Sequence, residues 1–276
     1  MNYLTIQEVK EIELKILLSI RDFCDSHNIR YYLAGGTLLG AIRHKGFIPW
    51  DDDIDIIMPR EDYKKFTSLF PVEGINGYLL YSPYTEHDSC IVFSKVYDQE
   101  TLKTDREFTQ KYWKCGVDID IFPTDGVPND SYKCKKYFRR QHFDYKILHA
   151  LVSEFKPGGS WLKDILRFIF AMLVKCVGKL HIIHTHDICI RINQRAEQNL
   201  IDNSEKIAVS IFPHYGTKEI VSKENFLKQI EVSFEGELFT APSGYDEYLH
   251  SLYGDYMKLP PIEKQVTHHL SEFYRK

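Results

Sequence analysis

The 276-residue sequence lacks the features that mark proteins for export, oxidation or nucleic-acid binding. Its six cysteines never form a C-x-x-C pair, which argues against a zinc knuckle and a disulfide framework. Lys and Arg number 35 against 39 Asp and Glu, so the formal net charge is −4 and no nucleic-acid partner is expected. The opening residues MNYLTIQEVKEIELK include acidic residues where a signal peptide needs an apolar core, so we predict a cytoplasmic protein. The cysteines are Cys24, Cys90, Cys115, Cys134, Cys176 and Cys189.

Long uncharged apolar runs are also absent. The most apolar region, residues 161–183, is interrupted by five charged residues. It has no run near the roughly 20 apolar residues that a membrane-spanning helix requires. Two alternatives remain for this region: a helix that lies in a membrane interface, or a buried core helix whose lysines reach the solvent.

The sequence does have clear helical and strand periodicity. Thr5 to Glu8 fits a capping box, and the apolar spacing that follows predicts a first helix ending near Ser26. Short apolar runs between Gly and Pro turns place the later elements. We expect strands over 29–34, 53–58, 77–81, 91–97 and 117–122, and near 207–212 and 231–240. We expect helices over 37–43, from 59 to a stop at Pro71, across 131–200 with a break at 157–159, and over 244–253.

This order of elements predicts an α+β fold. A small mixed sheet with helices would occupy residues 1–130. A helical region, serving as an acceptor-binding or membrane-interface element, would occupy residues 131–205. Residues 206–276 would form a C-terminal α/β extension that packs back onto the sheet.

The main candidate for chemistry is a pair of aspartates in an apolar strand. Asp53 and Asp55 alternate with apolar residues, so on a strand they would share a face, roughly 6–7 Å apart. Two such carboxylates repel each other and destabilise the fold unless a cation neutralises them.

A second apolar strand, residues 117–122, repeats this pattern with Asp118 and Asp120. If the two strands are neighbours, three carboxylates converge on one or two hard cations, an arrangement that holds Mg²⁺ against a phosphate. Asp118 and Asp120 share a face, so either of them would serve as the third ligand.

The aspartates have two simpler interpretations. One is a solvated acidic edge. The other is a calcium loop, since Asp51, Asp53 and Asp55 match its first three ligand positions. Ile56 stands where that loop requires glycine and Asp62 where it requires glutamate, so calcium binding of this type is not expected.

A glycine corner and several basic residues lie next to the acidic strand in the sequence. Gly35 and Gly36 allow close approach of the backbone to a ligand, and the following helix would direct N–H groups at a phosphate, with the Thr37 hydroxyl as a further donor. Alone, this motif is more often a plain turn. Three cations are candidates for binding phosphate oxygens, with a solvated basic loop as the alternative for the first two: Arg43, Lys45 and Lys95.

Taken together, these motifs closely resemble those of the LicD family. The resemblance rests on Gly-Gly-Thr, the basic loop, I-P-W-D-D-D-I-D and D-I-F-P-T-D-G-V-P within residues 30–128. It continues in F-E-G-E, A-P, Y-G-D-Y-M and P-P between residues 234 and 261, whereas residues 131–205 are not diagnostic.

The resemblance implies a nucleotidyltransferase-like fold and a phosphotransferase. Family members transfer phosphocholine from CDP-choline to cell-surface glycans or, in the related fukutin group, ribitol phosphate from CDP-ribitol. By this resemblance, residues 35–37 would face the phosphates, and Asp53 and Asp55 would bind Mg²⁺, or Mn²⁺ in its place. The family's D-I-F-P motif begins at Asp120, which favours Asp120 over Asp118 as the third ligand.

We therefore expect a Mg²⁺-dependent transfer of phosphocholine, or a related phospho-alditol, from a CDP-linked donor to a glycan hydroxyl. The acceptor would be a lipid-linked precursor of lipopolysaccharide or teichoic acid, reached by peripheral membrane contact on the cytoplasmic face. One alternative is a nucleotidyltransferase that moves a nucleotide from a triphosphate to a small acceptor. A second is a non-catalytic module whose acidic strands hold a structural cation. The oligomeric state is left open.

Overall fold

The protein is described by a computed structural model that covers residues 2–104, 115–158, 160–212, 215–266 and 272–276. Its main sheet contains seven strands, of which five follow the order β2-β3-β7-β5-β4, with β8 and β9 added beyond β7. β3 and β7 are parallel and the other pairs are antiparallel, so the expected mixed sheet in an α+β fold is confirmed. These strands are β2 (Tyr32–Leu33), β3 (Asp55–Pro59), β4 (Tyr78–Tyr81), β5 (Ser94–Asp98), β7 (Asp118–Gly126), β8 (Lys206–Ala208) and β9 (Val221–Ser222).

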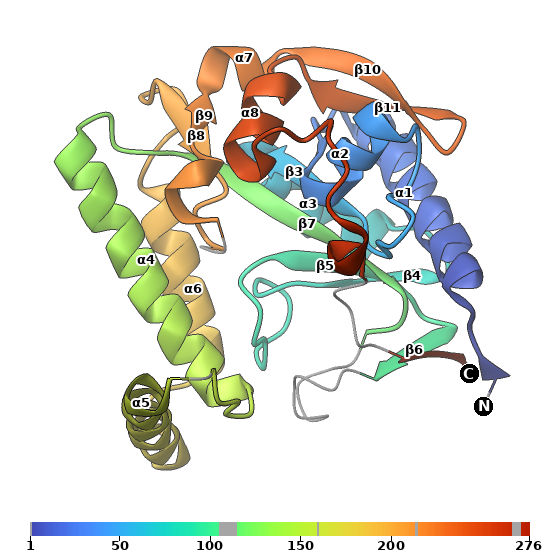
Figure 1. Ribbon diagram of the computed structural model, residues 1–276. Helices are drawn as coiled ribbons and strands as arrows, with labels where there is room; N and C mark the ends of the chain where they lie inside the picture. The colour runs from blue at the N-terminus through green and yellow to red at the C-terminus, as the bar shows by residue number, and fades with distance from the viewer. Residues whose placement is uncertain (1, 105–114, 159, 213–214, 267–271) are drawn as a thin grey trace.

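The helices lie on both sides of this sheet. Figure 1 shows β7 crossing the centre of the molecule, with α4 and α6 on one side and α1 on the other. The described helices are α1 (Ile6–His27), α2 (Gly35–Arg43), α3 (Arg60–Glu73), α4 (Ser131–Val152), α5 (Trp161–Lys179), α6 (Thr185–Glu197), α7 (Lys223–Leu227) and α8 (Tyr245–Tyr253). Two short 3₁₀ helices, η2 (Gly216–Glu219) and η3 (Ile262–Lys264), follow α6 and α8 respectively.

Two smaller sheets complete the fold. β1 (Asn2–Tyr3), β12 (Glu272–Arg275) and β6 (Thr101–Thr104) form a three-stranded sheet that joins both ends of the described chain, and the sequence pattern did not predict it. The predicted strand region 231–240 is a hairpin of β10 (Gln229–Phe234) and β11 (Glu237–Pro242). Its turn is at Glu235 and Gly236, which both have positive φ.

Local sequence signals account for several element boundaries. Thr5 and Glu8 form the predicted capping box at the start of α1. Pro71, predicted to stop α3, instead lies inside it near its last turn, where few further backbone hydrogen bonds depend on it. β3 begins at Asp55, two residues later than predicted, so Asp53 precedes the strand.

The main core is a large apolar cluster that includes residues from α1 to β12, such as Val9, Ile16 and Phe273. A small second cluster joins α4 to β8. The C-terminal part contributes to the main core directly, because β8 pairs with β7 and β11 packs against β2. The segment 34–57 and described residues between Val209 and Lys264 therefore line one pocket.

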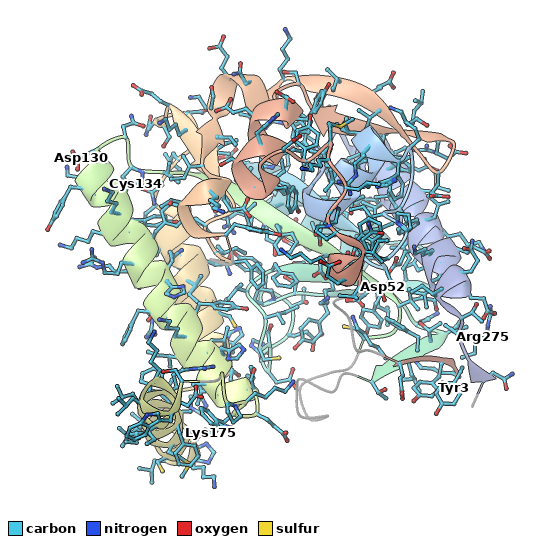
Figure 2. The ribbon with its side chains drawn as sticks, viewed as in Figure 1. Tyr3, Asp52, Asp130, Cys134, Lys175 and Arg275 are labelled. Atoms are coloured by element: carbon cyan, nitrogen blue, oxygen red, sulfur yellow. The ribbon has the colours of Figure 1, made fainter. Side chains whose placement is uncertain are left out.

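Helix α5 does not belong to this core, which excludes a buried core helix, one of the two alternatives left open for residues 161–183. Val174 is its one buried residue, and side chains project from it at the end of the molecule away from the sheet (Figure 2). Among the described residues, no helix combines the length and apolar character needed to cross a membrane.

Candidate active site

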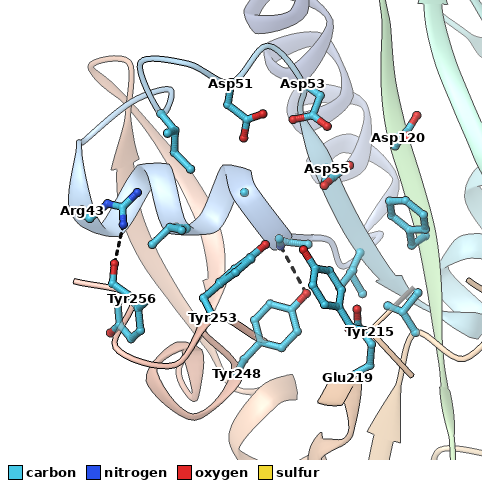
Figure 3. Close-up of a pocket in the computed structure, with 18 of the residues that line it drawn as sticks. Arg43, Asp51, Asp53, Asp55, Asp120, Tyr215, Glu219, Tyr248, Tyr253 and Tyr256 are labelled. Atoms are coloured by element: carbon cyan, nitrogen blue, oxygen red, sulfur yellow. Dashed lines mark hydrogen bonds between the residues drawn. The ribbon is translucent and has the colours of Figure 1, made fainter. Parts of the chain in front are cut away.

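The two acidic strands are neighbours, which is the condition that the expected carboxylate site required. β3 and β7 run parallel with Asp55 opposite Asp120, and the Asp120 N–H donates to the Ile54 carbonyl at 3.0 Å. A pocket of about 830 Å³ opens beside them. Four of the five aspartates that line it lie on the side of these strands, namely Asp51, Asp53, Asp55 and Asp120 (Figure 3), and the fifth, Asp255, follows α8. A volume of this size is typical of pockets for small ligands.

The structure separates Asp118 from Asp120. Asp118 is buried and forms ion pairs with Lys103, at 2.9 Å, and with Lys95. Burial opposes its ionisation, but the two lysines outweigh that effect and lower the pKa of Asp118 to about 2. Asp120 also pairs with Lys95, yet its side chain remains 24% exposed and lines the pocket. Only Asp120 of the two therefore reaches the pocket.

Negative charge is concentrated around Asp55. Burial raises the pKa of this carboxyl well above its usual range, and repulsion by Asp53, Asp120 and Asp51 raises it further. Lys95 offsets only part of this repulsion. A cation in the pocket would relieve it.

The donor set suits a hard divalent cation, because Mg²⁺ binds carboxylate oxygens. Within the described part of the chain, no three His, Cys, Asp or Glu side chains are gathered into a ready metal site. Mg²⁺ commonly takes one or two carboxylates together with substrate phosphates and several waters. One or two of the carboxylates of Asp53, Asp55 and Asp120 would suit such an ion, with phosphates and waters as its other ligands.

The glycine corner lies against these carboxylates at the start of α2. A Cβ atom on Gly35 would lie 2.9 Å from Asp55 Oδ2, and one on Gly36 would lie 2.7 Å from Asp51 Oδ2. Gly35 also has a φ of +51°, which L side chains rarely adopt. Both glycines line the pocket, and the Gly35 N–H donates to the Tyr248 hydroxyl at 3.4 Å.

Three residues predicted to bind phosphate lie outside the pocket lining. The buried Thr37 hydroxyl accepts a hydrogen bond from the Asp55 N–H at 2.8 Å, so it positions β3. Lys95 lies on β5 beside β7, where it pairs with Asp118 and Asp120. Lys45 is exposed beyond the end of α2.

Arg43, the remaining cation predicted to bind phosphate, does line the pocket. Its Nη1 donates to the Tyr256 carbonyl at 2.6 Å, and its Nε donates to His44 Nε2 at 2.9 Å. Burial lowers the pKa of the guanidinium, although an arginine remains charged near neutral pH.

The C-terminal wall of the pocket was not predicted from single residues. It consists of η2, α8 and the segment after α8, which sequence patterns alone did not bring together. α8 is fixed to η2 by a hydrogen bond from Ser251 Oγ to the Lys218 carbonyl at 2.6 Å. The one signal was the family-like Y-G-D-Y-M motif at the end of α8. Side chains of this wall include Tyr215, Glu219, Tyr248, Tyr253, Lys258 and Lys264.

Comparison of the sequence with known proteins first identifies the kind of domain that contains this pocket. The sequence profile of the family described as "LicD/FKTN/FKRP, nucleotidyltransferase domain" matches residues 28–155. This range contains the glycine corner and the acidic strands.

One relative extends the match to almost the whole chain, and a second matches a short part of it. The "Lipopolysaccharide cholinephosphotransferase LicD" of Haemophilus influenzae is 34% identical over 286 residues, covering 99% of each chain. The human "Ribitol 5-phosphate transferase FKRP" is 50% identical over 38 residues, which cover 14% of this chain and 8% of that protein. The protein therefore belongs to the LicD family, a family of phosphotransferases.

Proposed function

We propose that this protein transfers phosphocholine, or a closely related phospho-alditol, from a CDP-linked donor to a hydroxyl of a cell-surface glycan. The observation that carries the proposal is the convergence of Asp53, Asp55 and Asp120 from two neighbouring segments on one pocket. The full-length similarity to a cholinephosphotransferase supports phosphocholine as the group that is moved.

In this reaction the acceptor oxygen bonds to the distal phosphorus while the bond from that phosphorus to CMP breaks. Asp53, Asp55 and Asp120 would hold Mg²⁺, which neutralises the charge of the diphosphate. Arg43 lines the same pocket and would bind phosphate oxygens. Asp120 would take the proton of the acceptor hydroxyl, because it lines the pocket and Asp118, which pairs with Lys95 and Lys103, does not.

The alternative is transfer of a nucleotide from a triphosphate, which the family's description as a nucleotidyltransferase domain favours. Incubation with CDP-choline and with ATP, each with Mg²⁺ and a glycan acceptor, separates the two reactions. We expect CMP release from CDP-choline. Release of pyrophosphate from ATP, without CMP from CDP-choline, would overturn the proposal.

The matched variants for this assay are Asp55→Asn and Asp52→Asn. Asp55→Asn keeps the shape of a pocket residue and removes its charge, so we expect at least about a hundredfold loss of CMP release. Asp52 is buried nearby but does not line the pocket, so Asp52→Asn should retain most of the activity. Unchanged activity in folded Asp55→Asn would exclude the carboxylate pocket as the active site.

We further propose that the acceptor is a lipid-linked precursor of lipopolysaccharide or teichoic acid, met at the cytoplasmic face of the membrane. Helix α5 supports this, because it presents large apolar side chains to solvent, among them Trp161 at 71% and Leu166 at 69% exposed. Residues 131–182 contain eleven Lys and Arg against three Asp and Glu, whereas the whole chain is net negative. An apolar helix on a basic segment suits an anionic lipid surface.

A further inference from the structure

Glu219 is a buried carboxylate with an unsatisfied oxygen in the wall of the pocket. It is 8% exposed, and its Oε2 makes no hydrogen bond to the part of the chain that the structure describes. Leaving a carboxylate buried without a partner costs free energy. A ligand that supplies positive charge at this point would remove that cost.

Tyrosine side chains lie near this carboxylate. Tyr215, Tyr248 and Tyr253 line the pocket with it, and the rings of Tyr215 and Tyr253 meet edge to face with centroids 5.9 Å apart. Figure 3 places Glu219 beside Tyr215 and across the pocket from Asp51 and Asp53. The pocket therefore has a carboxylate end and an aromatic end, which adjoin where Tyr248 contacts Gly35.

The aromatic end has the chemistry that a quaternary ammonium requires. Such a cation has no N–H to donate, so it is recognised by aromatic faces and by a negative charge at contact distance. A carboxylate can also accept hydrogen bonds from the hydroxyls of an alditol chain, so Glu219 alone does not distinguish the two ligands. The faces of Tyr215, Tyr248 and Tyr253 suit the quaternary ammonium, whereas an alditol chain needs hydrogen-bond partners along its length.

We infer that Glu219 and the aromatic residues around it form the subsite for the quaternary ammonium of the donor, and that they select choline over alditols. This inference rests on the proposed function and names the group that is transferred. The diphosphate would then lie toward the aspartates at the other end of the pocket.

The test compares binding of phosphocholine with that of 3,3-dimethylbutyl phosphate, which has the same shape but carbon in place of nitrogen. Titration calorimetry on the full-length protein at pH 8.5, where Glu219 is charged, should give phosphocholine about tenfold tighter binding. Glu219→Gln should reduce this preference to about twofold or less, while binding of the neutral analogue stays the same.

Glu13→Gln is the matched control. Glu13 is also buried with an unpartnered Oε2, but it does not line the pocket. The preference for phosphocholine should persist in this variant. If Glu219→Gln does not fold, Tyr253→Leu tests the same subsite by removing an aromatic face.

Equal binding of the two compounds by the wild-type protein, or an unchanged preference in Glu219→Gln, would overturn the inference. Because binding is measured without transfer, a choline preference without CMP release would count against the proposed function alone. Release of CMP from CDP-ribitol without a choline preference would count against the subsite alone.

Discussion

At the scale of single residues, β7 gives two similar aspartates different surroundings. Asp118 and Asp120 are two positions apart on one strand, yet two lysines pair with Asp118 while Asp120 reaches the pocket. The sequence could place both on one face of a strand. It could not show which one Lys103 contacts, because that lysine comes from β6, a strand that the pattern did not predict.

Glu219 leads to a prediction on pH. Burial raises the pKa of its carboxyl to about 8, so in the free protein it is neutral below that pH and charged above it. A neutral carboxyl attracts a cation weakly. We therefore expect the affinity for phosphocholine, relative to the neutral analogue, to rise from pH 6 to pH 8.5 in calorimetric titrations.

The charged and titratable groups near Glu219 do not produce the same trend. Burial raises the pKa values of Tyr215 and Tyr248, so both hydroxyls stay neutral over this range. Asp55 affects the binding of phosphocholine and of 3,3-dimethylbutyl phosphate equally, because both compounds carry the same phosphate. Glu219→Gln should abolish the rise, and an equal rise in that variant would assign it to another group.

At the scale of elements, α5 differs from an ordinary surface helix because it exposes its large apolar side chains to solvent. It turns Val174 and Gly178 toward α4, where a Cβ on Gly178 would lie 2.7 Å from Leu151, and Lys175 donates to the Ser153 carbonyl. Its large apolar residues point outward instead. A soluble surface helix normally shows the reverse pattern.

This orientation predicts binding to anionic vesicles. The wild-type protein should float with vesicles containing phosphatidylglycerol at low salt, and a double Leu166→Glu/Leu173→Glu change should abolish flotation, because both side chains are about two-thirds exposed on α5. Leu238→Glu is the control, since Leu238 is 54% exposed on β11. Flotation of the α5 double variant at the wild-type level would refute membrane contact by this helix.

Elements with local signals were predictable from the sequence, and those set by distant pairing were not. The capping box of Thr5 and Glu8 starts α1 as predicted, and alternating aspartates located β3 and β7. The β1-β12-β6 sheet depends on pairing between the two ends of the described chain, which no local pattern encodes. For the same reason Tyr215 and Tyr253 could not be chosen among the 18 tyrosines before the fold was known.

At the scale of the whole molecule, one buried arginine joins three elements. Arg60 at the start of α3 donates to both Asp125 oxygens on β7, at 2.7 and 2.6 Å, and to Asn193 on α6 at 2.8 Å. Burial disfavours its charge, but the attraction of Asp125 outweighs this and raises the pKa of Arg60. The helical region is thus fixed to the sheet.

Removing this arginine should destabilise the whole protein. Arg60→Met leaves Asp125 buried and unpaired, which costs about 3–5 kcal/mol of unfolding free energy in urea titrations. A double change with Asp125→Leu should recover part of that loss. Arg30 pairs with Asp62 but is half exposed, so Arg30→Met should cost no more than about 1 kcal/mol. Equal losses for the two single variants would contradict this role of Arg60.

The pocket combines residues 34–57 with residues that extend to Lys264. The main core draws on both of these parts of the chain, and a domain generally folds as one unit. During synthesis, the glycine corner and both acidic strands leave the ribosome well before η2 and α8. A nascent chain that ends before α8 would therefore lack part of the core as well as the aromatic end of the pocket. We expect it to bind the donor only after α8 and the segment that follows have joined the fold.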